Sequence, residues 1–375
     1  MRLITAGESH GRALVGVIEG LPAGITINEE RINADLARRQ EGYGRGGRMK
    51  IETDKVEVLS GMIGGKTIAS PLAFTIKNRD YENWIPYMDP FTGEVDKKAL
   101  TAVRPGHADL SGIIKYGFGP NARPVLERAS ARETTTRVAA GSVCRQALEA
   151  IGVTITGRTL VIGGVGDESK WHDTIRAARL DGDTLGGCVE ITVHGMPVGV
   201  GSYVQYDRKL DAALAMHMMS INAVKAVEVG LGREFGYLRG SEAHDEIFPD
   251  GRKTNRAGGI EGGMSNGEDI VLTLTFKPIP TLVRGLRTVD VKTGEPVTAA
   301  NERSDVCVVE SAAVVVAESV AAYAVLDEIL KTFGGDTLDE LKADIRAKAL
   351  EKAQKQADSA FEQAAVDKAA ENTTV

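Results

Sequence analysis

The stretch VCVVESAAVVVAESVAAYAVLDEIL, residues 306–330, decides the fold class of this chain. With the residues up to 333 it is apolar on nearly every face of a helix, and it stops at Gly334 and Gly335. A helix of that composition is buried on most of its faces. Glu310 and Glu318 interrupt the apolar run, which argues against a membrane span. We therefore predict a buried helix over 306–333 that other elements cover.

Short β-rich segments with alternating polar and apolar residues supply the cover. Examples are KVEVLSG (55–61), PLAFTIKN (71–78), CVEITVHG (188–195) and DIVLTLTFK (269–277). Alternation of this kind is typical of half-buried antiparallel strands. Helical spacing recurs only in a few places, among them 135–152 and 208–221. The chain is therefore predicted to be α+β, with a buried helical layer sandwiched between antiparallel β-sheets.

One domain accounts for most of the length. No repeat and no Pro- or Ser-rich linker divides residues 1–336, which we predict to form a single catalytic domain. Thr337 followed by Glu340 is a capping-box pattern that opens one more helix. Beyond it the chain is rich in Ala, Lys, Glu and Gln, so residues 337–375 are predicted to be a C-terminal helix and a polar tail, partly solvated or disordered.

Composition excludes several classes of protein. The formal net charge of −7 over 375 residues argues against a nucleic-acid binder. Three widely separated cysteines indicate reduced thiols rather than a disulfide framework, and the start of the chain lacks the pattern of a signal peptide. We therefore expect a cytoplasmic location. No HxxxH or HExxH pattern occurs, so no metal site is expected.

Candidate chemistry begins in the basic, glycine-rich stretch RRQEGYGRGGRMK, residues 38–50. Its glycines match GxGxxG, but a helical segment precedes them where a dinucleotide-binding fold requires a strand. The remaining interpretation is a flexible loop that presents Arg39, Arg45 and Arg48 to an anion, with a solvated basic loop as the alternative.

Two histidines lie in polar loops beside glycine. His10 stands in TAGESHG (5–11) and His107 in RPGHADL (104–110). Histidine titrates near neutrality and exchanges protons readily, although a single histidine is more often structural. Two in such settings favour a catalytic interpretation.

Three further segments add anion-binding groups. PVLERASARETTTRVAAG (124–141) places arginines and hydroxyls just before a helix N-terminus, which favours an anion site. NRAGGIEGGMSNG (255–267) and FKPIPT (276–281) form a glycine-rich loop and a strand ending in Lys277, and ERSDVC (302–307) sets Arg303 at the entry to the buried helix. The residues alone predict an enzyme acting on a polyanionic, phosphorylated small molecule, and they leave the reaction open.

At these residues the chain resembles the chorismate synthase family. GESHGRALVGVIEGLP (7–22), ERASARETTTRVAAGSV (127–143) and RSDVCVVESAAVVVAES (303–319) are similar to its three signatures, in order, and the likeness runs from about residue 1 to 336. The resemblance implies a 1,4-elimination of phosphate from 5-enolpyruvylshikimate 3-phosphate that gives chorismate, in the shikimate pathway of aromatic amino-acid biosynthesis. It also implies reduced FMN as cofactor and a homotetramer.

The resemblance further implies roles for individual residues. His10 and His107 are proton donors, Ser9 and Ser130 are relay hydroxyls, and Asp336 helps flavin N5 accept the ring proton. The flavin contacts are Arg128, Ala129, Ser130, Asn222, Ala223, Gly262, Lys277, Pro278, Ile279, Pro280, Thr281 and Arg303. The substrate or NADP contacts are Arg39, Arg45, Arg48, Arg104 and Arg132.

Two other functions remain open from the sequence. The first is an NADPH-dependent flavin reductase, an activity that some members of the family combine with the lyase reaction. Without it, a separate reductase supplies the reduced flavin. The second is a non-enzymatic phosphosugar-binding protein, which would need the arginines but not the paired histidines.

Overall fold

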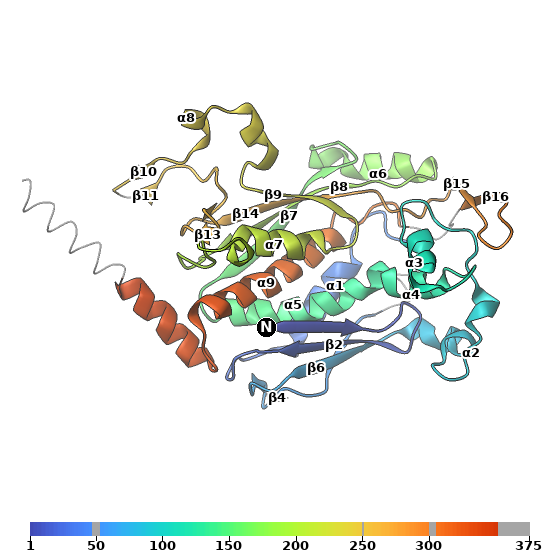
Figure 1. Ribbon diagram of the computed structural model, residues 1–375, viewed down its shortest axis with the longest axis horizontal. Coiled ribbons are helices and arrows are strands. Elements are labelled where there is room, and N and C mark those ends of the chain that lie inside the picture. The colour runs from blue at the N-terminus through green and yellow to red at the C-terminus, as the bar shows by residue number, and fades with distance from the viewer. Residues whose placement is uncertain (47–52, 250, 300–304, 352–375) are drawn as a thin grey trace, which may run out of the picture.

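Helix α9 (Ala312–Phe333) runs through the middle of the molecule in the computed structural model, which describes residues 1–46, 53–249, 251–299 and 305–351 (Figure 1). Most of its residues are buried, as the apolar composition of 306–330 predicts. The helix begins later than predicted, because residues 306–311 are held by long-range bonds instead. Val306 donates its N–H to the carbonyl of Gly44, and its own carbonyl accepts from Leu185.

Two antiparallel sheets enclose the helical layer (Figure 1). The first has the order β1-β2-β6-β3 and the second the order β7-β8-β14-β9. Their bounds are β1 (Arg2–Ala6), β2 (Ala13–Glu19), β3 (Val56–Val58), β6 (Leu72–Lys77), β7 (Thr154–Ile162), β8 (Gly187–His194), β9 (Val224–Val229) and β14 (Ile270–Phe276). Buried residues alternate with less buried ones along β2, β6 and β14, so each sheet turns one face toward the helices.

The layer between the sheets contains α1 (Glu29–Gln40), α5 (Thr134–Glu149), α7 (Leu210–Met219) and α9. Helix α5 packs on β2, while α9 packs on β7 and β8. The two helices approach so closely that a Cβ on Gly141 would lie 2.3 Å from the carbonyl oxygen of Ser319. Glycine is therefore required at that crossing. The predicted α+β sandwich is confirmed.

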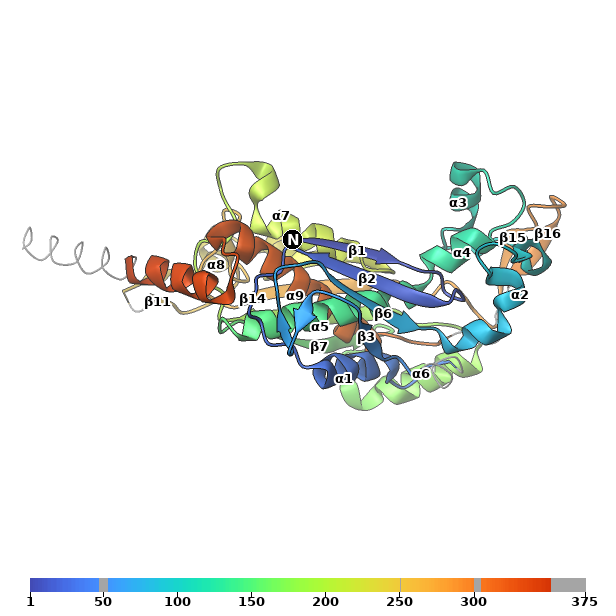
Figure 2. The same ribbon diagram turned by 90° about the horizontal axis from the view of Figure 1, so that it is seen from below.

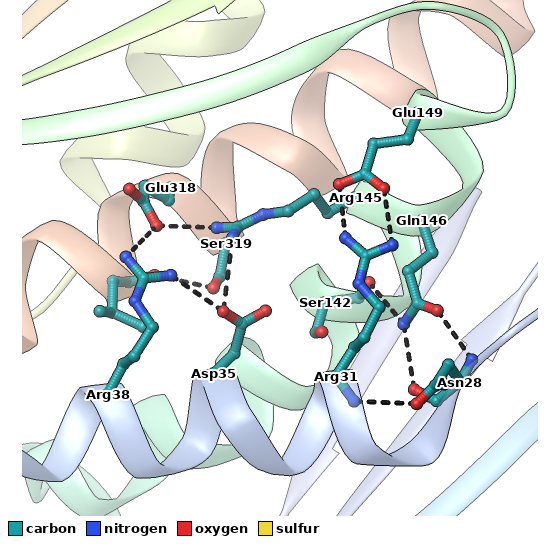
Figure 3. Close-up of polar contacts among 11 residues, drawn as sticks. Asn28, Arg31, Asp35, Arg38, Ser142, Arg145, Gln146, Glu149, Glu318 and Ser319 are labelled. Carbon is teal, nitrogen blue, oxygen red and sulfur yellow. Dashed lines mark hydrogen bonds and ion pairs between the residues drawn. The ribbon is translucent and has the colours of Figure 1, made fainter.

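A charged network joins three helices of this layer (Figure 3). Arg38 of α1 and Arg145 of α5 both reach Glu318 of α9, at 3.0 and 2.8 Å. Both also contact Asp35, at 2.9 and 3.3 Å. Glu318 and Asp35 are only 4% and 7% exposed, and a buried carboxylate needs partners of this kind. The network therefore compensates the two buried acids, one of which interrupts the apolar helix α9.

A small unit lies at one end of the sandwich, where α2 (Ile85–Met88), α3 (Asp109–Tyr116), α4 (Arg123–Ala129) and the hairpin of β15 (Leu286–Val289) and β16 (Pro296–Ala299) gather (Figures 1 and 2). Its core is separate from the main one and consists of Val103, Ile113, Ala122 and Val125. A bridge between Ala102 and Asp290 joins the hairpin to the helices. We call this the satellite unit.

The chain leaves the sandwich at the opposite end. Thr337 and Glu340 form the predicted capping box, since each backbone N–H is bonded to the other side chain, at 3.2 and 3.0 Å. Residues 338–351 are helical, and Leu341 is buried in the main core. The tail 352–375 lies outside the described residues. In the part of the chain that the structure covers, no helix is long and apolar enough to cross a membrane.

The remaining elements are short. They are α6 (Trp171–Leu180), α8 (Gly240–Ala243) and the two-stranded pairs β4 (Met62–Ile63) with β5 (Lys66–Thr67), β10 (Ile247–Phe248) with β11 (Gly251–Arg252), and β12 (Ile260–Glu261) with β13 (Met264–Ser265).

Candidate active site

The loop between β1 and β2 presents Ser9 and His10 in a tight turn. Gly11 donates its N–H to the carbonyl of Glu8 at 3.2 Å, so Ser9 and His10 occupy the two central positions. At Gly7 a Cβ would lie 2.5 Å from the carbonyl oxygen of Ala13, and its φ of +107° favours glycine. The glycine is therefore needed to bring the loop back onto β2.

Helix α4 supplies the partners of this turn. The Ser9 hydroxyl lies 3.1 Å from that of Ser130, and the Ser9 N–H donates to the carbonyl of Glu127. His10 Nδ1 lies 2.9 Å from Glu127 Oε1, and the His10 N–H donates to Oε2 of the same carboxylate at 2.8 Å. The imidazole ring packs 4.1 Å from the ring of Trp84.

Glu127 fixes how His10 faces a ligand. Burial raises the pKa of the Glu127 carboxyl, but the bonds and charge of His10 outweigh it and hold that pKa below its usual range. The ionised carboxylate therefore holds Nδ1, and Nε2 is the ring nitrogen that Glu127 does not hold. An imidazole held in this way is a proton donor of fixed direction.

His107 has a parallel arrangement in the satellite unit. Its Nδ1 lies 2.7 Å from Asp109 Oδ1, and Arg104 donates to both oxygens of Asp109, at 2.7 and 2.8 Å. Burial would raise the pKa of Asp109, yet the bonds from Arg104 and His107 hold it well below its usual range. Arg104, one of the predicted anion contacts, is therefore occupied by a carboxylate of its own chain.

A chain of contacts connects the two histidines. Lys277 donates from Nζ to the carbonyl of Gly106, next to His107, and from its N–H to the carbonyl of Ala223 at 2.9 Å. Asn222 in turn donates to the carbonyl of Ala129 at 3.4 Å. Ala223 has a φ of +72°, a left-handed conformation that strains an alanine. The structure thus brings predicted flavin contacts from three separate segments together between the histidines.

Other predicted flavin contacts lie around this group. Arg128 donates to the carbonyl of Thr5 at 2.9 Å, and the carbonyl of Ile279 accepts from Thr184 at 2.7 Å. Pro280 lies beside Gly106, since a Cβ there would meet it at 3.4 Å. Pro278 is exposed, and Thr281 is partly exposed.

Two predicted anion-binding arginines are buried behind Ser130. Arg132 donates from Nη1 to Asp54 at 2.7 Å, and Arg39 Nη1 lies 3.7 Å from the same carboxylate. Arg39 and Arg132 are only 4% and 5% exposed. Burial lowers the pKa of Arg39 to about 9, partly offset by Asp54, so the Arg39 guanidinium is charged near neutral pH. Two buried cations share one anion, which leaves a positive field near Ser130.

The basic loop itself is partly described. Arg45 lies 3.7 Å from Asp305, and the N–H of Gly46 donates to the same carboxylate. The N–H of Tyr43 donates to Glu310 at 2.6 Å, which fixes the loop on the segment before α9. Arg48 and Arg303 lie outside the described residues.

Two predicted site residues lie away from this group. Gly262 belongs to the β12–β13 hairpin, whose Gly263 accepts a bond from Leu210 at the start of α7, whereas Asn222 follows the far end of that helix. A ten-residue helix is about 15 Å long. Asp336 follows the C-terminal end of α9, where its carbonyl accepts from Ala23 at 2.8 Å.

Strand β1 shows how far Asp336 is from His10. It starts beside the C-terminal half of α9, where the amino group of Met1 pairs with Asp327, and it runs toward α4 (Figure 1). His10 follows that far end. Within one chain, Asp336 and His10 therefore lie at opposite ends of the sandwich.

Three acids and one amide that hold the site were not among the residues predicted from the sequence. Glu127, Asp109 and Asp54 are between 0% and 5% exposed, and Asn78 is 4% exposed. Asp109 is two residues from His107, a spacing that signals a local pair. Glu127 and Asp54 carry no such signal, since they meet their partners only through the fold.

The arrangement is that of an enzyme site for a small polyanion, because it combines two histidines held by carboxylates with buried arginines near one of them. Comparison with known proteins agrees. The family model described as chorismate synthase matches residues 1–330. A curated chorismate synthase of Thermoanaerobacter pseudethanolicus is 56% identical over 347 residues, covering 91% of this chain and 96% of that protein.

Further comparisons point the same way. A curated chorismate synthase of Caldanaerobacter subterraneus is 54% identical over 349 residues, with 91% and 96% covered. A solved structure titled as a crystal structure of chorismate synthase matches with a TM-score of 0.74 and 34% identity, covering 93% of this chain and 97% of that one. The chain belongs to the chorismate synthase family, and the resemblance identified from the sequence is confirmed.

Proposed function

We infer that this protein is a chorismate synthase, a lyase that eliminates phosphate from 5-enolpyruvylshikimate 3-phosphate and gives chorismate in the shikimate pathway. The observation that carries the inference is the pair of carboxylate-held histidines, His10 with Glu127 and His107 with Asp109, within a chain of this family. The substrate has one phosphate and two carboxylates, and a site with clustered cations suits it.

We propose the following division of roles. His10 donates a proton from Nε2 to an oxygen of the departing phosphate, and Glu127 stabilises the imidazolium that carries that proton. Ser9 and Ser130 relay protons through their hydroxyl contact. Arg45 and Arg48 bind the substrate anion directly. Arg39, Arg104 and Arg132 assist through their charge, since each is bonded to an acid or carbonyl of this chain.

The residues between the histidines fit reduced FMN. An ammonium, a carboxamide, a hydroxyl and a guanidinium, on Lys277, Asn222, Ser130 and Arg128, offer donors for a phosphate and for ring carbonyls, and the turn at Ala223 exposes backbone between them. When bound, reduced flavin supplies electron density as the allylic C–O bond breaks. We propose that Lys277, Asn222, Ala223 and the segments 128–130 and 278–281 hold it, with His107 beside it as proton donor.

Three predicted site residues, Arg303, Gly262 and Asp336, are not among the residues gathered between the two histidines. Arg303 lies outside the described residues, and Gly262 lies at the other end of α7. We propose that Asp336 acts in the site of a neighbouring subunit of a homotetramer, because it is remote from His10 in its own chain. We further propose that residues 1–336 form one catalytic domain and that the enzyme works in the cytoplasm, where its three free cysteines stay reduced.

The two alternative functions have weaker support. Every strand pair within the two large sheets is antiparallel, so the described residues offer no parallel βαβ unit for a nicotinamide nucleotide. A separate reductase is then the source of reduced flavin. A non-enzymatic phosphosugar-binding protein would not need histidines oriented by buried carboxylates.

An anaerobic assay tests the proposal. Purified protein is mixed with 5-enolpyruvylshikimate 3-phosphate and photoreduced FMN, and chorismate absorbance and phosphate release are followed together. We expect one phosphate per chorismate, and no turnover with oxidised FMN. NADPH oxidation by the pure protein with FMN would instead support the reductase. No turnover by folded, flavin-binding protein would contradict the lyase function.

A further inference from the structure

Asn78 lies directly after strand β6 and is almost fully buried, at 4% exposure. Its side-chain nitrogen donates to the carbonyl of Glu8 at 3.1 Å and to the carbonyl of Gly11 at 2.7 Å. Those two carbonyls belong to the first and last residues of the turn that carries Ser9 and His10. One carboxamide therefore holds both ends of the turn.

The remaining polar atoms of Asn78 tie the turn to the buried arginines. Its side-chain oxygen accepts from Arg132 Nε at 2.9 Å, and Arg132 is held by Asp54 at 2.7 Å. The backbone N–H of Asn78 donates to the carbonyl of Arg12 at 3.3 Å. A carboxamide has two N–H donors and one carbonyl acceptor, and all of them have partners here.

We propose that Asn78 is a positioning residue for His10. In this role Asn78 does not touch the substrate. Its two N–H donors hold both ends of the turn that carries His10, and the turn sets the direction of the imidazole. This inference rests on the proposed function. It adds that catalysis by His10 requires the two N–H donors of Asn78, in addition to the bond that Asn78 accepts from Arg132.

The alternative is that Asn78 only satisfies a buried arginine. Asn78→Asp separates the two possibilities, because aspartate keeps an acceptor for Arg132 but replaces the NH₂ group by an oxygen facing two carbonyl oxygens. If Asn78 only accepts the bond from Arg132, this variant should work like wild type. If its N–H donors hold the turn, the variant loses them and His10 moves. Misplacement of a catalytic group by about 1 Å costs about a hundredfold in rate.

The experiment is a double-mutant cycle of Asn78→Asp with His10→Ala, read as chorismate formation under photoreduced FMN. We expect Asn78→Asp to lower kcat about a hundredfold in the wild-type background. In the His10→Ala background we expect less than about a twofold loss, because the group being positioned is absent. The affinity for FMN should remain unchanged. Asn78→Ala, which loses donors and acceptor together, repeats the cycle if Asn78→Asp does not fold.

The control is Asn33→Asp on α1, whose side-chain oxygen accepts from Val56 at 3.0 Å and which is remote from the turn. It should turn over like wild type. An equal loss of kcat for Asn78→Asp in both backgrounds, or wild-type turnover by Asn78→Asp, would overturn the inference. Wild-type protein that makes no chorismate would instead overturn the proposed function.

A second readout needs no turnover. His10 packs against Trp84, and a neighbouring imidazole quenches indole emission. In Asn78→Asp the turn is released, so Trp84 emission should rise to the level seen in His10→Ala. Emission that stays at the wild-type level would show that the turn does not depend on the Asn78 donors.

Discussion

The two histidine–carboxylate pairs of this protein have the same chemistry and opposite origins. His10 and Glu127 are 117 residues apart and meet where the β1–β2 loop contacts α4. His107 and Asp109 are two residues apart, in one turn at the start of α3. The first pair exists only when the satellite unit is docked on the sandwich, whereas the second requires little more than its own turn.

The difference indicates how the site is assembled. The satellite unit has a core of four buried side chains, far smaller than the main core. Its position relative to the sandwich is fixed in part by the bonds of Ser9 and His10 to α4. The long-range pair thus contributes to docking in addition to its proposed catalytic role, while the local pair holds its own turn.

Loss of the long-range imidazole should have the largest effect. His10→Ala removes the proposed proton donor and should lower kcat by about a hundredfold. The measurement is chorismate formation with photoreduced FMN. The matched control is His194→Ala, which removes an exposed histidine that also pairs with an acid, Asp269, at 2.8 Å. Equal losses in the two variants would show that His10 has no special role.

Neutralising the partner of His10 should cost somewhat less. Glu127→Gln keeps the size of the side chain but removes the charge that stabilises the imidazolium, so kcat should fall about thirtyfold with little change in KM. Glu149→Gln is the control, because Glu149 pairs with Arg31 on the surface of the helical layer (Figure 3). A rise in KM at constant kcat would place Glu127 in substrate binding instead.

Loss of the local pair, His107 with Asp109, should reduce the stability of the fold. Asp109→Asn should lower the free energy of unfolding by about 2 kcal/mol at pH 7. The folded-state pKa of Asp109 is depressed, so this stabilisation is complete above the unfolded value of about 3.9 and is lost as pH falls through the folded value. Urea unfolding of both proteins from pH 7 to pH 3 measures the difference.

The control for this comparison is the exposed pair. Asp269→Asn should cost less than about 1 kcal/mol, because solvent screens Asp269 and His194. A difference between wild type and Asp109→Asn that grows as the pH is lowered would contradict the assigned direction of the pKa shift.

The predictability of these elements from sequence follows the same division. Helix α1 is the helical segment predicted before the glycines of the basic stretch, and the four quoted β-rich segments overlap β3, β6, β8 and β14. Local alternation and helical spacing specify such elements directly. His10 and His107 could be selected because glycine loops around them are local features.

Long-range partners could not be obtained in this way. Asp54 and Arg132 are 78 residues apart, and no local sequence pattern near either residue predicts their contact. The same holds for the start of α9, which depends on the bond that Val306 donates to Gly44 and the bond that it accepts from Leu185. Apolar composition alone extended that helix by six residues, because it does not report which backbone groups already have partners.

The smallest effect is expected at the lysine that joins the His107 turn to the second sheet. Lys277→Gln removes one cation from the proposed flavin site and should weaken FMN binding about tenfold. Burial and the nearby Lys225 lower the pKa of Lys277. As the pH rises, Lys277 therefore loses its charge before the usual lysine pKa of about 10.4 is reached, and FMN binding by wild type should weaken at that lower pH. Quenching of flavin fluorescence measures both effects.

Lys225→Gln is the matched control, because Lys225 is an exposed cation near Lys277 and its charge lowers the pKa of Lys277. It should leave FMN affinity at neutral pH within about twofold of wild type. If Lys277→Gln retained full affinity but lost turnover, the bond from Lys277 to Gly106 would matter for the His107 turn rather than for the flavin. The local pair would then depend on the sandwich as the long-range pair does, and the contrast between the two histidines would be smaller than the structure indicates.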